Sequence, residues 1–245
     1  MSALSLAANL PVLALLLAAA SASPFETDTL ATSGGELKIT LIGHGTLMFQ
    51  FGGQVIHVDP VGRYADYTRL PKADLILVTH EHGDHLDKQA IERITKDGTL
   101  LVLTARCAEQ LGRGVVMKNG DVRQCGGLKV EAVPAYNVVH QRSPGQPFHP
   151  RGVGNGYVIT FADQRVYVAG DTENIPELAD LTGIDMAFLP MNLPYTMTPE
   201  MVAQAVRVIK PRIVYPYHFG DTDTSRLVHL LKDAPHVEVR VRNMK

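Results

Sequence analysis

Several residue types and motifs are scarce in this chain of 245 residues, and each scarcity excludes a class of site. The chain has two cysteines, Cys107 and Cys125, too far apart for a C-x-x-C pair, which argues against a thiolate zinc site. In an oxidising compartment they could form a disulfide, although two small buried hydrophobic residues are the commoner outcome. No G-x-S-x-G motif presents a nucleophilic serine. The chemistry of this chain must come from other residues.

Basic clusters and long hydrophobic runs are also missing. The formal charge is -2 with no run of Lys or Arg, so we predict no nucleic-acid partner, because such binding depends on neutralising phosphates. The apolar run of residues 10–20 is too short to span a bilayer, and Ala20-Ser21-Ala22 is an A-x-A cleavage site. We therefore predict a signal peptide over residues 1–22, one domain over 23–245, and a periplasmic or secreted protein without stable membrane insertion after processing. Because no Lys or Arg precedes the run, an uncleaved tethering helix is the alternative.

The remaining segments alternate between strand-like and helix-like patterns. Short β-branched or aromatic runs bounded by turn residues predict strands, the first three of them antiparallel, at residues 36–43, 46–52, 54–60, 73–80, 99–104, 128–135, 156–161, 165–171, 184–190, 213–218 and 237–241. Apolar residues at helical spacing predict helices at 86–98, 105–113, 198–210 and 224–233. This order best fits an α/β fold, a four-layer αββα sandwich of two sheets with helices on their outer faces.

The stretch "THEHGDHLD", residues 79–87, crowds three histidines and two acids into six positions after a buried strand. A solvated polar loop is the ordinary explanation, but imidazole and carboxylate are also ligands of borderline divalent metals. In an extended segment His80 and His82 point to the same side. Gly83 permits a change of direction, so that Asp84 and His85 can face a second metal. The stretch predicts a two-metal site.

Four predicted strands deliver an acid or an imidazole at their C-terminal ends. Asp59, His80, Asp171 and His218 end separate strands. Each has an ordinary explanation by itself, since Asp commonly forms turns and a lone His is usually structural. All four at one edge with the histidine-rich loop indicate a shared site.

The motifs "LIGHGT", "VIHVDP", "THEHGDHLD", "AGDT" and "YPYHFG", in this order, resemble the metallo-β-lactamase-fold hydrolases, over residue 37 to the C-terminus. The resemblance is greatest to the branch of ascorbate-6-phosphate lactonase-like proteins and other metal-dependent hydrolases. It implies two divalent ions, Zn²⁺ first and Mn²⁺ second. It also implies a ligand set: His80 and His82 on the first ion, Asp84, His85 and His218 on the second, and Asp171 bridging the two ions.

A third histidine for the first ion is expected from the loop after residues 128–135. We predict His149, because "PFHPRG" resembles a recurrent motif of the branch and its prolines stiffen the chain, with His140 as the alternative. Asp59 and His44 are expected to support the ligands or line the pocket. A turn-forming role for Asp59 before Pro60 is the other interpretation.

The resemblance implies an enzyme, a hydrolase in which a hydroxide held by two metals attacks a small ester, lactone or phosphoester. Asp84 is predicted to be catalytic as well as a ligand. The loop that holds Asn192 and Tyr195 is expected to line the pocket, where both could polarise a substrate oxygen, and a packing role for Tyr195 is the alternative. The alternatives are a β-lactam hydrolase, a di-iron oxidoreductase of the same fold, or a binding protein. The di-iron branch usually has Glu where this chain has His82. A small molecule is the expected partner, and the sequence leaves the substrate and the oligomeric state open. The other histidines, His57, His229 and His236, are expected to be structural.

Overall fold

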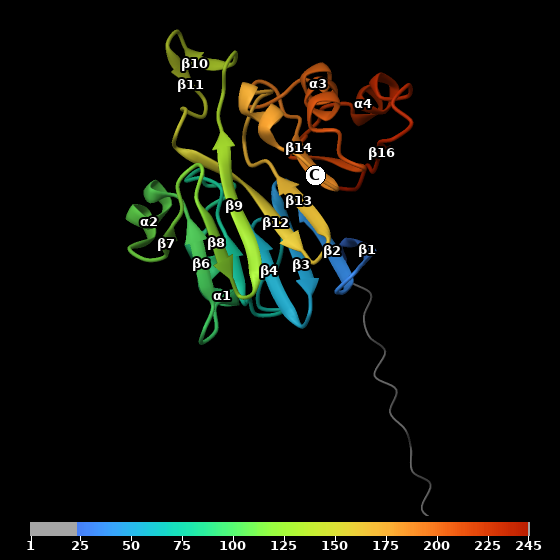
Figure 1. Cartoon of the computed structure of the whole chain (residues 1–245). Coiled ribbons are helices and arrows are strands. Elements are labelled where there is room, and N and C mark those ends of the chain that lie inside the picture. Colours follow the sequence, from blue (N-terminus) through green and yellow to red (C-terminus); the bar gives the residue numbers. More distant parts are fainter. Residues whose placement is uncertain (1–23, 245) are drawn as a thin grey trace, which may run out of the picture.

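The structure, a computed structural model, describes residues 24–244. Within this range two seven-stranded sheets face each other (Figure 1). The predicted signal peptide and its cleavage site lie outside the described residues. No helix within residues 24–244 is long and apolar enough to cross a membrane.

The first sheet comes from the N-terminal half of the chain. Its strands, in spatial order, are β1 (Glu26–Thr32), β2 (Gly35–Gly43), β3 (Thr46–Phe51), β4 (Gln54–Val58), β5 (Leu75–Leu77), β6 (Leu100–Leu103) and β7 (Val115–Val116). The first four are antiparallel neighbours, and β4 to β7 are parallel. Parallel pairing of β4 and β5 brings their carboxyl ends to one edge.

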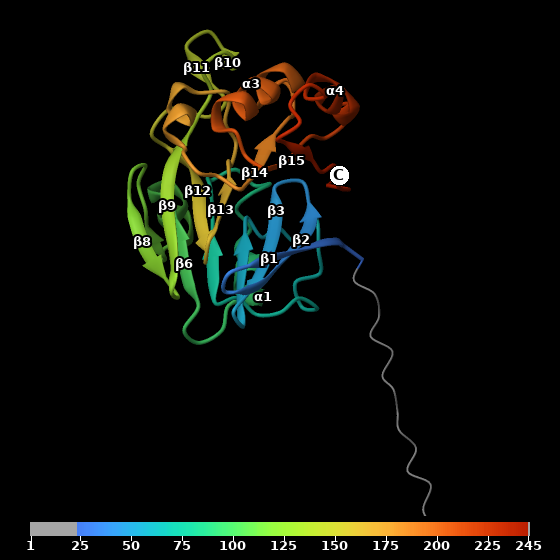
Figure 2. The same cartoon turned by 45° about the vertical axis from the view of Figure 1, so that its right-hand side comes forward.

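The second sheet comes from the C-terminal half. Its strands, in spatial order, are β16 (Glu238–Val239), β15 (Ile213–Tyr217), β14 (Met186–Pro190), β13 (Gln164–Val168), β12 (Gly154–Phe161), β9 (Leu128–Ala135) and β8 (Val122–Cys125). The strands β13, β14, β15 and β16 are parallel neighbours. Their carboxyl ends therefore also share an edge. A small hairpin of β10 (Gln141–Ser143) and β11 (Gln146–Pro147) projects beyond the sheet, on the same side as α3 (Figure 2).

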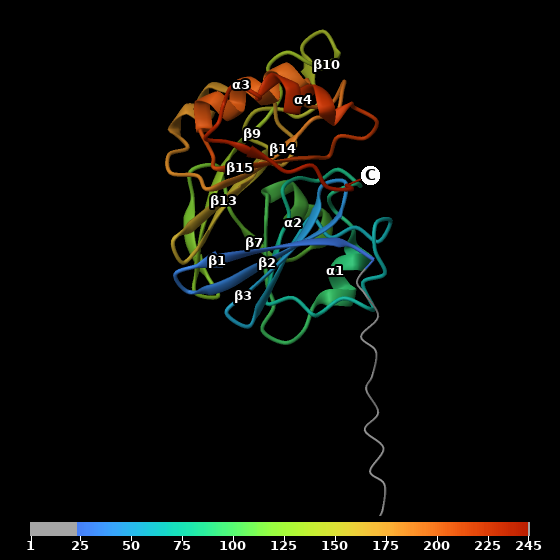
Figure 3. The ribbon, with the colours of Figure 1, turned by 90° about the vertical axis from the view of Figure 1, so that its right-hand side faces the viewer.

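Helices cover the outer side of each sheet. Beside the first sheet lie α1 (Lys88–Ile94) and α2 (Ala105–Leu111), and above the second lie α3 (Pro199–Ile209) and α4 (Thr224–Leu230), with a short 3-10 helix, η1 (Pro176–Asp180), next to α3 (Figure 3). Thr198, the first residue of the helix predicted over 198–210, is the N-cap of α3, because its hydroxyl accepts from the Met201 amide at 3.1 Å. The predicted αββα layering is confirmed.

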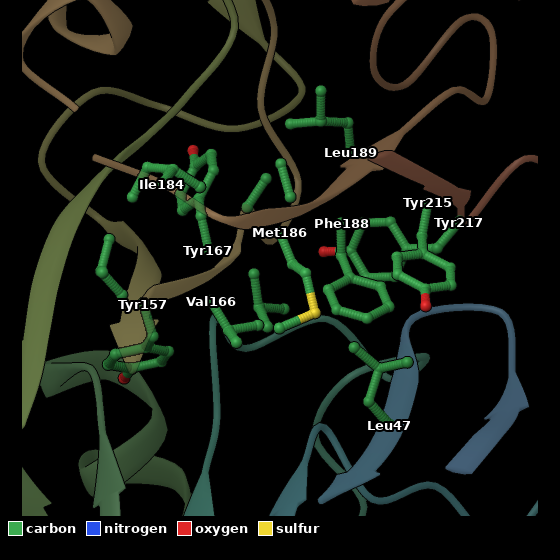
Figure 4. Close-up of a cluster of buried hydrophobic side chains, with 14 of the residues drawn as sticks. Leu47, Tyr157, Val166, Tyr167, Ile184, Met186, Phe188, Leu189, Tyr215 and Tyr217 are labelled. Atoms are coloured by element: carbon green, nitrogen blue, oxygen red, sulfur yellow. The ribbon is translucent and has the colours of Figure 1, made fainter. Parts of the chain in front are cut away.

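The core fills the space between the two sheets. Figure 4 shows Leu47 of β3 facing Met186 and Phe188 of β14 across this space. The Phe49 ring, also on β3, packs edge-on against Phe188 with ring centroids 5.9 Å apart. A separate apolar cluster joins α1 and α2 to the outer side of the first sheet. Burial on both faces holds the sheets rigid beneath their carboxyl edge.

Some sequence predictions differ from the observed elements. No strand was predicted at residues 26–32, which form β1, because part of what holds this strand is distant in sequence: Asp28 accepts hydrogen bonds from Tyr215 and Arg242 near the other end of the chain. The strand predicted at 237–241 is shortened to β16. Cys107 and Cys125 are free, buried and packed in different apolar clusters, one on each side of the first sheet. The two cysteines are therefore small buried hydrophobic residues and do not form the disulfide that was the other interpretation.

Candidate metal centre

The carboxyl edges of the two sheets meet and assemble one site. Asp59 and His218 directly follow β4 and β15, while His80 and Asp171 each lie three residues beyond the last residue of β5 and β13. Since β4 pairs with β5 in parallel, and β13, β14 and β15 run parallel, all four ends point to the same side. Ligands bind at this edge of open α/β sheets.

The histidine-rich loop is a tight turn between β5 and α1. The amides of His85 and Leu86 both donate to the His82 carbonyl, at 2.9 and 2.8 Å. Asp87 then caps α1, because its side chain accepts from the first helical amides. The turn does not use the conformational freedom expected of Gly83, which is absent from the positive-φ glycines and faces open space. Gly83 instead lines the pocket.

One cluster gathers His80, His82, His149 and Asp171, each offering one ligand atom within 4.8 Å of the others. His80 Nε2 lies 3.0 Å from His82 Nδ1, and His149 Nε2 lies 3.2 Å from Asp171 Oδ2. We call this the first cluster. Of its members, His82 alone is partly exposed.

A second cluster gathers His44, Asp84, His85 and His218 under the same distance limit. Asp84 Oδ2 lies 3.2 Å from His44 Nε2 and 3.5 Å from His218 Nε2. The His44 and His218 rings are in contact, with centroids 3.7 Å apart. His44, expected to support ligands or line the pocket, thus lies among the candidate ligands of the second cluster.

Asp171 lies between the two clusters. Its Oδ2 is 3.2 Å from His149 Nε2 in the first cluster and 3.4 Å from His218 Nε2 in the second, and its Oδ1 is 3.4 Å from His85 Nε2. A carboxylate with imidazoles on both sides is placed as a bridging ligand would be. The structure therefore brings together all seven predicted site residues. Their role as ligands stays a prediction.

Buried hydrogen bonds set which ring nitrogen of each histidine faces the site. Asp59 is fully buried and accepts from the Thr79 amide at 2.7 Å, the Thr79 hydroxyl at 2.6 Å and His85 Nδ1 at 2.8 Å. A carboxylate can only accept, so His85 Nδ1 carries a proton and Nε2 is the ring nitrogen that faces the second cluster. His80 Nδ1 lies 3.1 Å from the same Thr79 hydroxyl, which leaves His80 Nε2 for the first cluster. Such partners orient metal-binding imidazoles.

The hydrogen bonds of the loop after β9 show which of its two histidines, His149 or His140, faces the clusters. Asn137 Oδ1 accepts from both the backbone amide and Nδ1 of His149, at 2.8 and 2.6 Å, and this turns Nε2 toward Asp171. His140 Nδ1 instead donates to Glu173 Oε1 at 2.6 Å and points away from both clusters. His149 is therefore the candidate ligand of this loop.

Three site residues have left-handed backbone conformations. His44, Asp59 and His218 have φ values of 54°, 46° and 46°. Non-glycine residues adopt this region rarely and at a free-energy cost, which accumulates at functional sites. The amide of His218 donates to the carbonyl of His44 at 2.9 Å, so one backbone contact holds two of these residues together.

The charges of the site are strongly coupled. Burial raises the pKa of Asp171, but His218 and His85 outweigh it and hold that pKa well below its usual range. Burial lowers the pKa of His85, but Asp171 and Asp59 raise it to about 9. For His80, burial and the neighbouring His85 lower the pKa well below its usual value. The Asp171 carboxylate is therefore ionised, and each protonated imidazole of the site disfavours protonation of its neighbours.

Several buried polar atoms of the site have no hydrogen-bond partner within the described chain. They are His85 Nε2, Asp171 Oδ1 and both ring nitrogens of His218. An unpartnered buried polar atom costs about 1 to 3 kcal/mol, so several at one point require an explanation. Lone pairs of imidazole and carboxylate facing one another fit divalent cations, and the donors are those that zinc takes.

A pocket of about 560 Å³ opens onto both clusters. Beyond the cluster residues, the pocket is lined by Arg63, Tyr64, Arg142, Phe148, Asn192 and Tyr195. Asn192 and Tyr195 line it as predicted. The Asp84 side chain, 39% exposed, is the most accessible carboxylate of the site. A small molecule can therefore reach the space in front of both clusters.

Sequence reasoning missed several residues that build or line the site. Asn137 and Glu173 hold the loop of His149, and Arg63 and Arg142 line the pocket. The one usable signal was the position of Glu173, an acid two residues after a strand-ending aspartate. Asn137 and Arg63 lie in loops and Arg142 in the three-residue strand β10, all without periodic pattern, so nothing local shows what they contact.

Comparisons with known proteins agree with this geometry. Residues 38–218 match the Beta-lactamase superfamily domain. The UPF0173 metal-dependent hydrolase of Thermococcus onnurineus is 34% identical over 199 residues, which are 75% of this chain and 85% of that protein.

Solved structures show the same architecture. A protein described as a metal-dependent hydrolase, from Parabacteroides distasonis, is 50% identical and superimposes with a TM-score of 0.86, over 90% of this chain and all (100%) of that one. A metallo hydrolase from Ignicoccus hospitalis is 24% identical with a TM-score of 0.70, over 85% of this chain and 95% of that one. The second likeness shows the fold alone.

Proposed function

Since this chain belongs to the metal-dependent hydrolases of the β-lactamase superfamily, we propose that it uses two divalent ions to cleave a small ester, lactone or phosphoester. The observation that carries this proposal is the pair of clusters that meet at Asp171. One carboxylate between two sets of imidazoles suits a dinuclear site better than two independent ones.

The proposed ligand assignment follows the two clusters. His80, His82 and His149 would hold the first ion, and Asp84, His85 and His218 the second, with Asp171 on both. His44 would orient Asp84, whose Oδ2 lies 3.2 Å from its Nε2. Imidazole and carboxylate donors without a thiolate favour Zn²⁺, and Mn²⁺ is the second choice.

Two divalent ions bound there would supply a hydroxide near neutral pH and polarise the bond to be cleaved. The protein's own residues then have separate tasks. Asp84, the most exposed carboxylate of the two clusters, is placed to hold and move a proton at its carboxylate oxygens in front of the pocket. Asn192 and Tyr195, on the pocket wall, would donate to a substrate oxygen. No serine or cysteine among the pocket residues offers a covalent nucleophile.

The alternatives have weaker support. A β-lactam hydrolase would share this site, and no feature of the pocket selects that substrate. The di-iron oxidoreductase is disfavoured, because that branch usually has Glu where this chain has His82. His82 Nδ1 faces the first cluster. The likeness to ascorbate-6-phosphate lactonase-like proteins also stays a prediction.

Export of the protein is part of the proposal. The apolar run of residues 10–20 and the A-x-A site support cleavage after Ala22 and a periplasmic or secreted location. Intact-mass measurement of protein recovered from the cell envelope tests this. An unprocessed N-terminus would contradict it.

The main experiment measures metal content and hydrolysis together. We expect about two ions per chain by elemental analysis after reconstitution with zinc or manganese. A panel of lactones, aryl esters, phosphodiesters and β-lactams then identifies the bond. Asp84→Asn should lower turnover by about 10²- to about 10⁴-fold, as for loss of a positioned acid-base group. Absence of bound metal after reconstitution would refute the proposal.

A further inference from the structure

Two arginines line the pocket without a carboxylate partner. Arg63 lies in the loop after β4, and Arg142 lies on β10, in the projecting hairpin (Figures 1 and 2). Within residues 24–244 neither forms an ion pair. Arg106 on α2, by contrast, pairs with Glu81 of the histidine-rich loop at 2.9 Å. Both side chains are on exposed residues at the pocket mouth. Their charges are therefore available to a ligand.

Arg142 has two contacts, and both place it over the first cluster. Its Nη2 lies 3.3 Å from His82 Nε2, and its guanidinium carbon is 5.4 Å from the centroid of the Phe148 ring. Phe148 in turn packs edge-on against Tyr195, with centroids 5.1 Å apart. The aromatic pair supports the guanidinium at the side of the pocket.

The contact between Arg142 and His82 leaves most of the guanidinium unused. A guanidinium has five N–H donors and no acceptor, and this contact uses Nη2 alone. The remaining donors are available in the pocket that Arg142 lines, where they need an acceptor.

The net charge of the pocket indicates what that acceptor is. Arg63 and Arg142 balance Asp84 and Asp171, the two carboxylates that line the pocket. Two divalent ions would leave the pocket strongly positive, and a positive cleft concentrates anions. A planar guanidinium binds carboxylate or phosphate through two parallel hydrogen bonds.

We propose that Arg63 and Arg142 bind an anionic group of the substrate, a carboxylate or a phosphate, that is separate from the bond being cleaved. The inference deepens the proposed hydrolase function and rests on it, and it makes both arginines specificity-determining residues.

Matched esters test the proposal on the full chain reconstituted with zinc. The three substrates are methyl butyrate, monomethyl succinate and the methyl carboxylic ester of 3-phosphonopropionate, and hydrolysis is followed by acid release in a pH-stat. They share the leaving group and the chain length, and differ in whether the far end is a methyl, a carboxylate or a phosphonate. We expect kcat/KM to favour an anionic ester over butyrate by about 10- to about 100-fold, the range of a hydrogen bond to a charged group. The anionic ester with the higher value identifies the group.

Substitutions then locate the effect. Arg142→Gln and Arg63→Gln should each remove most of the preference for the anionic ester, and Arg142→Lys should keep part of it, since it retains the charge but not the two parallel donors. Arg123→Gln, an exposed arginine on β8 outside the pocket lining, removes the same charge and should leave the preference unchanged. Equal loss for neutral and anionic esters, or loss in Arg123→Gln, would overturn the proposal.

Calorimetry supplies a measurement that does not depend on turnover. Succinate and 3-phosphonopropionate are titrated into wild-type and Arg142→Gln protein, with zinc bound and after chelation. With zinc bound, Arg142→Gln should weaken the Kd of the preferred anion by about 10-fold or more. Equal Kd values in the two proteins would refute the anion site. If none of the three esters is cleaved but this difference in Kd is found, ester cleavage by the proposed hydrolase fails and the anion site stands.

Discussion

Glu173→Gln tests how the fold holds the loop that carries His149. Glu173 is fully buried, and its two oxygens accept five hydrogen bonds from that loop. Oε2 accepts from the amides of Val138 and Val139 at 2.7 and 2.6 Å. Oε1 accepts from Asn137 Nδ2 at 2.9 Å, the His140 amide at 2.7 Å and His140 Nδ1 at 2.6 Å. Every partner is a donor.

The amide of a glutamine cannot satisfy these donors in either orientation. If its NH₂ replaces Oε2 it faces the amides of Val138 and Val139, and if it replaces Oε1 it faces the amide of His140. A backbone amide cannot become an acceptor, so at least one is left unpaired, at about 1 to 3 kcal/mol, and the charge is lost from the other bonds. We expect a loss of about 2 to 5 kcal/mol, limited by opening of the loop, since Val138 and Val139 are 52% and 65% exposed.

Opening of the loop has a second consequence, because Asn137 both donates to Glu173 and accepts from His149. The variant should therefore lose stability in urea unfolding and also lose zinc from the first cluster. Glu177→Gln is the matched control. Its partners are the Tyr136 hydroxyl and Arg151, whose side chain is 73% exposed, so the change should stay below about 1 kcal/mol. Glu173→Gln with wild-type stability and metal content would refute the reasoning.

Three further predictions concern single positions. His149→Ala should reduce zinc content by about one ion per chain while His140→Ala retains both, and elemental analysis showing the opposite pattern would contradict the assignment. Gly45→Ala should weaken zinc affinity by about 10- to about 100-fold, because its Cβ would lie 2.7 Å from a ring carbon of a second-cluster histidine, whereas Gly83→Ala meets open space and serves as the control in a chelator titration. His57 is fully buried, and burial lowers its pKa to about 4. Because the unfolded chain then binds the proton more tightly, the stability that this residue contributes above its unfolded pKa of 6.5 is lost as the pH falls toward 4, about 2 kcal/mol of it between about pH 7.5 and about pH 5. The pH dependence of urea unfolding should be weaker by that amount in His57→Gln, and unchanged slopes would count against it.

Much of the fold could be predicted from sequence because it depends on local pattern. Alternation and continuous apolar runs identified β2, β3, β4 and the parallel strands, and Thr198 marked the start of α3. The short strands β7, β8, β10 and β11 have too little pattern to be recognised. The strand β1 was misread because its stability comes from contacts of Asp28 with Tyr215 and Arg242, which are almost the whole chain away.

The sequence by itself also determined which residues converge. Strand-ending Asp59, His80, Asp171 and His218 reach one edge because parallel strands align their carboxyl ends, and this direction follows from the order of the elements. The turn after His80 keeps Asp84 and His85 at the same edge. Composition and spacing were enough to place both at one site.

Only the tertiary structure decided how the side chains are oriented and what surrounds them. His149 rather than His140 turns into the site because Asn137 and Glu173, 36 residues apart, divide the two imidazoles between them. The placement of Arg63 and Arg142 on one pocket depends likewise on the docking of two distant loops. These choices are made by hydrogen bonds and packing between segments far apart in the chain, and such contacts leave no periodicity in the sequence around either partner.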